Sequence, residues 1–486
     1  MRQIIFLLAF LFSAIAHGQF TLSDTIDLAQ EHIMDLRFDE ARSLLQVEKN
    51  AHPDNGMLPY LKSNLVFLDL FISNDPKAYE PAVDSIEFLI DQVKANDVDT
   101  GALYLFTLSE MYFELGTIHM LFGNNWKSAW AMLDAFGYIK RNREAPETFL
   151  PQQLADGVLN VSMGSMPGKY KWLTNMLGYS GDVEKGLEQL ERATQVGGTP
   201  YASFKKKTSF VYSYINFFLK SDPDFNVWEV DSNYLESPLL IFVQARIYRE
   251  RGENDALIKL LNSRSKENRR DFYFLDFMLG KAMLNKLDPD ADAAFLTFLS
   301  KYPGENSVKA AHRYLSWHYF LRGNKQLSEK YRQLTLTKGV TRIGADKQAL
   351  LDVSSDYNLA LLKGQLFFDG GYLQKSLDAL AIGTDSYNET REKIAFHYRL
   401  GRIYQQMDDW SQAIQSYKHV LQYEEAKNTF EAGNAALQLG LIYEEQEKGE
   451  EAERYFKLAL DQENFPFDDG IHQKAKAGLS RLKSKS

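Results

Sequence analysis

Residues 400–404 read Leu-Gly-Arg-Ile-Tyr, and residues 439–443 read Leu-Gly-Leu-Ile-Tyr. In both stretches an alanine follows the tyrosine by nine residues, at Ala413 and Ala452, and an aromatic residue stands four positions after that alanine. The glycines of the two stretches are 39 residues apart. Small residues repeated at this spacing predict pairs of helices that approach closely, because larger side chains would hold the two helices apart.

Weaker copies of the same pattern occur upstream. Gly364 is followed by a turn at Gly370-Gly371, Gly280 follows a leucine, and Ala41 precedes Pro53 by twelve residues. The repeated unit resembles the tetratricopeptide repeat (TPR), in which two antiparallel helices stack on the next two. The resemblance implies an all-α fold, a right-handed α-solenoid of antiparallel helix pairs that forms a TPR-like superhelix.

The first residues are typical of a secretion signal. Arg2 precedes an almost unbroken apolar run over residues 4–15, and Ala16-His17-Gly18 offers small residues for cleavage before Gln19. The run is shorter than the roughly 20 apolar residues that cross a bilayer, and no later segment is long and apolar enough. We therefore expect an exported protein, periplasmic or secreted, cleaved near Gly18-Gln19, for which peripheral association with the cell envelope is possible.

Composition limits the kinds of partner. The 486 residues include 65 acidic and 55 basic ones, for a formal net charge of -10. Because contacts with phosphates need a basic surface, this balance argues against a nucleic-acid partner. The chain has no cysteine, which excludes disulfides and the lipidated cysteine of bacterial lipoproteins. Apolar residues make up 45% of the sequence, enough for a sizeable core.

These signals divide the sequence into four parts. We predict a signal peptide over residues 1–18, an N-terminal helical TPR-like module over 19–200, divergent helical repeats over 201–340 and C-terminal TPR repeats over 341–486. The strand signal is weak throughout, and helical periodicity fits most stretches. Whether the N-terminal and C-terminal halves form one continuous superhelix is left open by the sequence.

A second pattern lies within residues 116–191. Its best-matched stretch comprises Gly157-Val158-Leu159-Asn160, Ser165-Met166-Pro167, Leu177-Gly178-Tyr179-Ser180-Gly181-Asp182 and Gly186-Leu187-Glu188-Gln189-Leu190. This order is similar to a signature of the eukaryotic inclusion-body-clearance family of TPR proteins. The resemblance implies a specialised helical N-terminal half followed by TPR units, and a non-enzymatic role in protein and lipid handling.

The same residues also have a purely structural interpretation. A glycine-rich stretch ending in Asp182 predicts a helix end followed by a cap, in which the aspartate accepts the first free amides of the next helix. Gly186 then allows two helices to pack closely.

We found no pattern of catalytic residues. The stretch Gly164-Ser165-Met166-Pro167-Gly168 lacks the G-x-S-x-G spacing of a nucleophile elbow. The alternating carboxylates of residues 288–292 lack the turn glycine of a calcium loop, and Leu299 stands where its final glutamate is needed. His312 and His318 are six residues apart and fall on different sides of a helix. We therefore predict that the protein is not an enzyme, with no catalytic residue, no cofactor and no metal site.

In TPR proteins the first helices of successive pairs line a concave groove that receives a peptide. Similarity to those grooves implies eight partner-binding positions on three first helices: Asn358, Gln365, Phe368, Tyr398, Arg402, Gln405, Asn434 and Glu444. An amide can bond a peptide backbone, and a guanidinium can bind a carboxylate through two hydrogen bonds. The alternative is that these are simply exposed polar residues.

We predict from these observations an exported TPR scaffold that binds a protein or peptide partner of unknown identity. An envelope binder of a glycan, a lipid or another small molecule is the alternative. Both readings depend on the groove expected of the fold rather than on a catalytic pattern.

Overall fold

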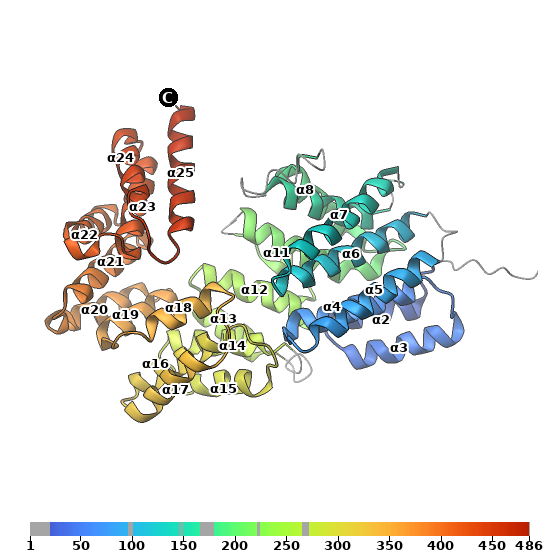
Figure 1. Cartoon of the computed structure of the whole chain (residues 1–486), viewed down its shortest axis with the longest axis horizontal. Coiled ribbons are helices and arrows are strands. Elements are labelled where there is room, and N and C mark those ends of the chain that lie inside the picture. Colours follow the sequence, from blue (N-terminus) through green and yellow to red (C-terminus); the bar gives the residue numbers. More distant parts are fainter. Residues whose placement is uncertain are drawn as a thin grey trace, which may run out of the picture. The chain divides into compact units, whose positions relative to one another are not determined.

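The computed structural model describes residues 20–95, 101–144, 146, 149–165, 179–220, 224–264 and 272–485 of the chain. Every regular element in these ranges is a helix (Figure 1), so the prediction of an all-α fold built from adjacent antiparallel helix pairs is confirmed. The predicted signal peptide and residues 166–178 of the second sequence pattern lie outside the described residues.

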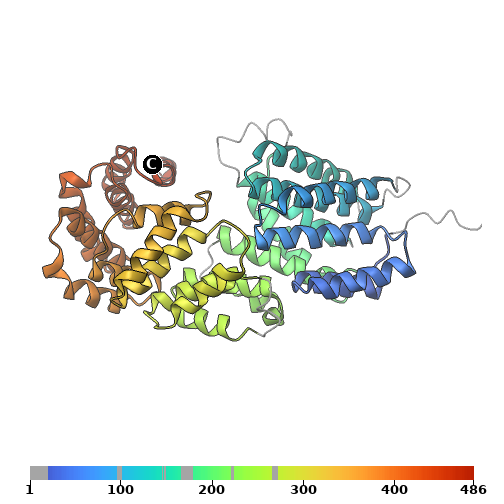
Figure 2. The ribbon, with the colours of Figure 1, turned by 60° about the horizontal axis from the view of Figure 1, so that its bottom comes forward.

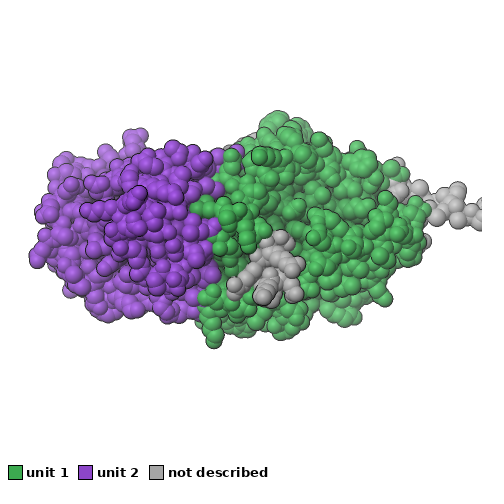
Figure 3. Space-filling model, turned by 90° about the horizontal axis from the view of Figure 1, so that it is seen from below, with its two compact units in different colours: residues 1–248, 259–277, 297–306 green, residues 249–258, 278–296, 307–486 purple. Residues whose placement is uncertain are grey.

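Two compact units divide the chain (Figure 3). The first comprises Met1–Tyr248, Lys259–Phe277 and Thr297–Asn306, and the second comprises Arg249–Ile258, Met278–Leu296 and Ser307–Ser486. Four helices therefore contribute residues to both units, namely α12 (Pro238–Glu250), α13 (Asn254–Asn262), α14 (Phe274–Asn285) and α15 (Ala291–Lys301). The sequence-based boundaries after residues 200 and 340 separate different types of repeat, whereas the two units are defined by compactness. Those two boundaries therefore stay predictions.

Most consecutive helices are joined by short connections (Figure 2). The N-terminal ones are α2 (Asp24–Met34), α3 (Phe38–Ala51), α4 (Met57–Ser73), α5 (Tyr79–Ala95), α6 (Ala102–Leu121), α7 (Asn125–Arg141), α8 (Pro151–Gly164), α10 (Val183–Ala193), α11 (Lys205–Lys220) and α12 (Pro238–Glu250). The following ones are α13 (Asn254–Asn262), α14 (Phe274–Asn285), α15 (Ala291–Lys301), α16 (Val308–Leu321), α17 (Lys325–Thr337), α18 (Gly344–Asp352) and α19 (Leu359–Asp369). The chain continues with α20 (Leu373–Ile382), α21 (Thr390–Gln406), α22 (Trp410–Gln422), α23 (Phe430–Glu445), α24 (Gly449–Leu460) and α25 (Asp468–Lys485).

A left-handed residue ends the first helix in each of six tightly connected pairs. In Gly323 the φ angle is +72°, and in Glu447 it is +58°. One residue in this conformation reverses the chain within a few positions, so that the second helix returns along the first. The six turns at Leu36, Gly123, Gly323, Gly371, Asp408 and Glu447 share the spacing of small residues described next. Left-handed residues also stand between α12 and α13 at Gly252 and between α14 and α15 at Leu287.

Small residues at fixed distances from these turns let each pair close. Seven residues before the left-handed position stands a small residue of the first helix, and five residues after it stands a small residue of the second. Ser376, for example, donates a hydrogen bond to the carbonyl oxygen of Gly364 across 2.6 Å. The small pairs are Ala29 and Ala41, Gly116 and Ser128, Ser316 and Ser328, Gly364 and Ser376, Gly401 and Ala413, and Gly440 and Ala452.

A larger side chain then covers the small residue of the first helix. A Cβ atom added to Gly401 would lie 2.6 Å from the Tyr417 ring, sixteen residues later in the sequence. The closeness of these helices at Gly401, which the sequence predicts, is therefore confirmed. The same contact occurs between Gly116 and Met132, between Gly364 and Leu380, and between Gly440 and Phe456. The pattern thus extends from the C-terminal repeats into the N-terminal half.

In the N-terminal module, helices α8 and α10 form a pair in which glycines of both helices make the close contacts. The Asp182 side chain caps α10 by accepting a hydrogen bond from the Lys185 amide at 3.1 Å, as the sequence predicts. A Cβ atom on Gly186 would lie 2.8 Å from the backbone nitrogen of Val161 in α8, and one on Gly157 would lie 2.7 Å from Leu190. These glycines bring α8 and α10 into close contact, which confirms the packing role expected for Gly186.

Candidate functional site

The predicted groove residues lie mostly on α19, α21 and α23, the first helices of three consecutive pairs. Helix α21 contacts both α19 and α23 within the second compact unit. Because first helices of successive pairs adjoin, side chains on their shared side form one surface although they are more than thirty residues apart in sequence. We call this surface, formed by Gln365, Phe368, Tyr398, Arg399, Arg402, Gln405 and Asn434, the α21 face.

Amide and hydroxyl groups connect the helices beneath this face. The Asn434 amide donates to the Tyr398 hydroxyl across 2.5 Å, which joins α23 to α21, and both residues are buried. The Tyr417 hydroxyl donates to the Gln405 side-chain oxygen at 2.6 Å, and the Gln405 amide donates to Gln438 at 2.9 Å. The hydrogen bonds of these amides within the chain hold α21, α22 and α23 at a set spacing.

Arg402 lies over an aromatic ring. Its guanidinium carbon is 5.3 Å from the centre of the Phe368 ring, and one of its terminal nitrogens donates to the Tyr398 hydroxyl at 3.3 Å. Stacking leaves the planar edge of a guanidinium available for further hydrogen bonds. The structure therefore brings together Phe368, Tyr398 and Arg402, three of the residues expected from the sequence.

Arg399 is a further charged residue of the face that the sequence analysis missed. Its terminal nitrogen donates to the Gln365 side-chain oxygen at 2.8 Å, whereas its buried Nε has no hydrogen-bond partner among the described residues. Burial lowers the pKa of this arginine, against the attraction of Asp369 and Glu431. Its position three residues before Arg402 is the signal that could have found it, because residues i and i+3 share a helix face.

The two arginines carry charge without a matching anion at short range. Within the described part of the chain, neither Arg399 nor Arg402 has a carboxylate oxygen within 4.0 Å. Two guanidinium groups on one side of α21 thus offer donors that match a carboxylate in geometry and charge.

The remaining two predicted positions form bonds at the edges of the face. The Asn358 side chain caps α19 by accepting from the Ala360 and Leu361 amides, and its own amide donates to Glu392 at 2.8 Å. Glu444 accepts two hydrogen bonds from Arg481 of α25, at 2.8 and 2.6 Å. A partner that used either residue would have to compete with these bonds.

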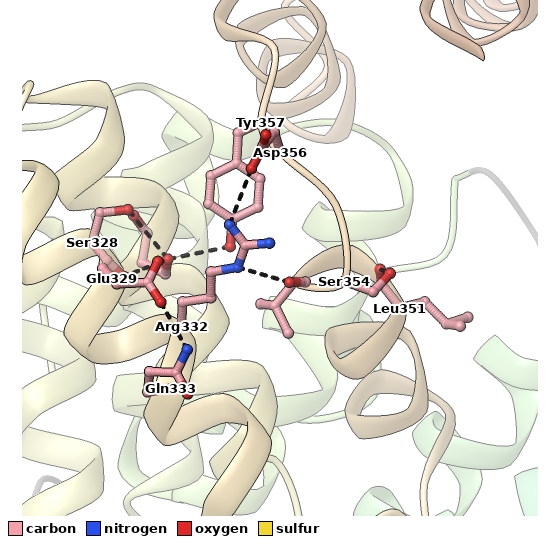
Figure 4. Close-up of polar contacts among 10 residues, drawn as sticks. Ser328, Glu329, Arg332, Gln333, Leu351, Ser354, Asp356 and Tyr357 are labelled. Carbon is pink, nitrogen blue, oxygen red and sulfur yellow. Dashed lines mark hydrogen bonds and ion pairs between the residues drawn. The ribbon is translucent and has the colours of Figure 1, made fainter.

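A polar cluster around Arg332 positions the beginning of α19 (Figure 4). The Arg332 Nε donates to the Val353 carbonyl at 2.8 Å, and its terminal nitrogen lies 3.4 Å from the Asp356 carboxylate. The guanidinium also lies over the Tyr357 ring, whose hydroxyl bonds Ser316 at 3.2 Å. The connection between α18 and α19 is therefore held on α16 and α17, which orients the first helix of the face.

The first unit contains a different polar cluster, which is largely buried. The Lys207 ammonium of α11 lies 2.5 Å from Glu110 and 3.9 Å from Glu114 of α6. The Glu114 carboxylate also accepts from Ser63 and Asn64 of α4, at 2.9 and 2.8 Å. Its polar groups have partners, and the cluster joins three helices, which assigns it a structural role.

Burial dominates the protonation of this cluster. It raises the pKa of Glu114 to about 8, although the nearby Lys207 charge acts in the opposite direction. A carboxyl group of this kind is largely protonated at neutral pH, and the ion pair of the cluster is then the one between Lys207 and Glu110.

Within the described ranges, no three histidine, aspartate or glutamate side chains are grouped so that they could hold a metal ion. Among the helices in those same ranges, none combines the length and apolar character needed to cross a membrane.

Comparison with known proteins identifies one repeat. The tetratricopeptide repeat family model matches residues 396–428, which include most of α21 and all of α22. No curated protein matches the sequence. The matched segment contains Arg399, Arg402 and Gln405 of the α21 face.

Solved structures align with most of the chain at low identity. They include the human IFIT1 dimer with PPP-AAAA, with 14% identity, 91% of this chain and 96% of that chain covered, and a TM-score of 0.32. The Cut9–Hcn1 hetero-tetramer of APC/C aligns with 12% identity, coverage of 95% and 96%, and a TM-score of 0.24. The TPR domain of P58(IPK) aligns with 12% identity, coverage of 88% and 99%, and a TM-score of 0.23. These TM-scores are low, so the assignment depends on the family model and the helix pairs: the chain is an all-helical repeat protein that contains a tetratricopeptide repeat at residues 396–428.

Proposed function

We propose that this protein is a non-catalytic, exported TPR scaffold that binds a protein partner through the α21 face. The observation that carries the proposal is the pair of arginines, Arg399 and Arg402, which share one side of α21 without a carboxylate at ion-pair distance in the described chain. Such partly desolvated guanidinium groups favour an incoming carboxylate, because a charge-assisted hydrogen bond contributes about 1.5–3 kcal/mol.

The chemistry of the face indicates the kind of segment that would bind. Two guanidinium groups would pair with a carboxylate, either of an acidic side chain or of a chain end. The Phe368 ring offers apolar contact beside them, and the surrounding amides can bond a peptide backbone. A partner segment with at least one carboxylate next to an apolar side chain satisfies all three features.

Export is part of the proposal and is supported by the sequence alone. The apolar run of residues 4–15 and the small residues before Gln19 favour cleavage during secretion. The partner would then be a protein of the same envelope or extracellular compartment. The resemblance of residues 157–190 to the inclusion-body-clearance family supports a non-enzymatic role, and that relationship also stays a proposal.

The test is retention of partners by the mature chain and by two matched double variants. Proteins retained from an envelope extract are identified by mass spectrometry, and their affinities are then measured one by one. R399A/R402A is expected to weaken a specific partner by about tenfold or more, since two charge-assisted hydrogen bonds are lost. R391A/K393A removes two exposed cations from the same helix and should leave that affinity unchanged.

Equal affinity of the wild type and R399A/R402A for every retained protein would contradict binding through the α21 face. Circular dichroism of each variant establishes that the helices are intact before the affinities are compared. If R391A/K393A loses the partner as completely as R399A/R402A does, the proposal is also contradicted, because the partner would then be attracted by overall charge alone.

A further inference from the structure

A basic groove in the first unit has no role in the function proposed above. It lies over α3, α4 and α5, where it encloses a volume of about 470 Å³. Its lining residues are Arg42, Leu45, Gln46, Lys49, Lys62, Leu65, Val66, Ser85, Phe88, Leu89 and Gln92. Three of these are cations and none is an acid, in a chain whose acidic residues outnumber its basic ones by 65 to 55.

The apolar floor of the groove is continuous with an exposed ring. Leu45, Leu65 and Leu89 are buried at 3%, 6% and 6% exposure and form the base. Phe88 is 63% exposed at the side of the groove. A recess with an apolar base and a projecting aromatic ring is a feature of surfaces that bind another molecule.

The cations at the rim are incompletely paired. Arg42 forms an exposed ion pair with Asp39 at 2.8 Å. Burial raises the pKa of the Asp69 carboxyl, and the Arg42 charge partly offsets this effect. Lys49 and Lys62, in contrast, have no ion-pair partner within the described ranges. The two ammonium groups are near enough for Lys49 to add to the effect of burial in lowering the pKa of Lys62.

Glu48, which adjoins Lys49 in the sequence, does not relieve this charge. Glu48 of α3 faces away from the groove, where its oxygens accept hydrogen bonds from Ser23 and Asn55 and bond His52. Lys62 is half-buried and Lys49 is exposed. Their like charges repel each other, and an external anion between them would reduce this repulsion.

The length of the strip matches a short helix. The lining residues of α3 run from Arg42 to Lys49 and those of α5 run from Ser85 to Gln92, which is eight residues in each helix. The seven steps from first to last correspond to about 10 Å, or two helical turns. A helix that offers two turns of apolar side chains with carboxylates beside them would cover the leucine floor and reach both lysines.

We infer that the groove over α3, α4 and α5 binds an acidic amphipathic helix of a partner protein, with Lys49 and Lys62 pairing its carboxylates and Phe88 packing on its apolar side. This site uses the second helix of one pair and both helices of the next, so it is separate from the α21 face. It does not depend on the function proposed for that face.

The probe is a synthetic amphipathic peptide with leucine at helical spacing and glutamate on both flanks of the leucine stripe. Its affinity for the full mature chain is measured by calorimetry or fluorescence anisotropy at low and high salt. We expect saturable binding that weakens as salt increases, and a loss of tenfold or more in K49E/K62E. F88S should weaken binding without removing its salt dependence, because it changes only the apolar contact.

Two controls separate the groove from overall charge. K77E/K140E makes the same change of charge at exposed positions of the first unit outside the groove, and it should bind the peptide as the wild type does. The carboxylates of the peptide also suit the α21 face, so K49E/K62E is compared in the R399A/R402A background as well, where failure of this site and failure of the α21 face can be told apart. A peptide with glutamine in place of every glutamate should bind at least tenfold more weakly.

The inference is overturned by any of three results: no binding of the acidic peptide, equal binding by K49E/K62E, or equal binding of the glutamine peptide. Vesicles that contain anionic lipid are tested in parallel. If the vesicles bind through Lys49 and Lys62 and the peptide does not, the groove recognises a membrane surface instead and the inference is wrong.

Discussion

Contact between Gly401 and the Tyr417 ring determines how closely α21 and α22 approach. G401A adds a methyl group 2.6 Å from that ring. The tyrosine or its helix must shift, so we expect a loss of about 1–3 kcal/mol in the free energy of unfolding. Chemical denaturation monitored by circular dichroism measures this change.

Gly449 provides the matched control in the same unit. A Cβ atom there meets no atom within 4 Å, so G449A should be neutral or slightly stabilising. Equal stability of G401A and G449A would show that the close approach of the two helices is not required.

Burial of Glu114 makes the stability of the first unit depend on pH. Its pKa is raised in the folded chain from 4.5 to about 8, so the folded state binds the proton more tightly than the unfolded state does. The resulting stabilisation is complete below pH 4.5 and is lost as the pH rises through about 8. E114Q keeps a neutral side chain of similar shape and removes this dependence.

We therefore expect the wild type to lose stability relative to E114Q between pH 5 and 8, as measured by urea titrations at several pH values. E87Q, on an exposed position of α5, should follow the wild type across the same range. Parallel curves for the wild type and E114Q would contradict the raised pKa.

At the scale of the helix pair, the left-handed turn and the two small residues act together. The turn reverses the chain, and the small residues at seven positions before it and five after it allow the helices to meet. Pairs with glycine at the turn, such as Gly323, adopt this conformation without strain, whereas Glu447 adopts it with a side chain. A side chain in this conformation costs about 1 kcal/mol.

The turn therefore predicts opposite effects for two substitutions. E447G should raise the free energy of unfolding by a few tenths to about 1 kcal/mol, because strain is relieved. G323A should lower it by about 1 kcal/mol, although no atom lies within 4 Å of the added Cβ. If the thermal unfolding midpoints of both variants shift in the same direction relative to the wild type, turn strain is not the cause of the change in stability.

At the scale of the whole molecule, the two compact units carry different polar surfaces. The second unit contains the α21 face with its two arginines, and the first contains the basic groove with Lys49 and Lys62. Both surfaces are locally cationic in a chain of net charge -10, which favours acidic partner segments and disfavours non-specific binding to anionic polymers.

Export predicts a processed N-terminus for the whole chain. Expressed in a bacterium with a secretion system, the protein should be recovered from the periplasm or medium without residues 1–18, beginning at Gln19. Intact mass and N-terminal sequencing measure this. Recovery of the full-length chain from the cytoplasm alone would contradict export. Replacing Ile5 and Leu8 by lysine should block export, because it breaks the apolar run.

The sequence by itself determined the class of fold and the repeat. Glycine at 401 and 440, alanine at 413 and 452 and the aromatic residues that follow are local signals, because each helix pair closes through residues within sixteen positions of one another. The same locality explains why Asp182 and Gly186 could be assigned a cap and a packing role in advance. Most of the predicted positions on α19, α21 and α23 also share one surface, since their spacing follows from the repeat.

Only the tertiary structure decided which charges are paired. Glu444 is engaged by Arg481, thirty-seven residues away, whereas Arg399 and Arg402 are left without a carboxylate at short range in the described residues. The basic groove likewise depends on side chains that three separate helices bring together. Pairing of charges is set by distances between residues far apart in sequence, and no local pattern of residue types carries that information.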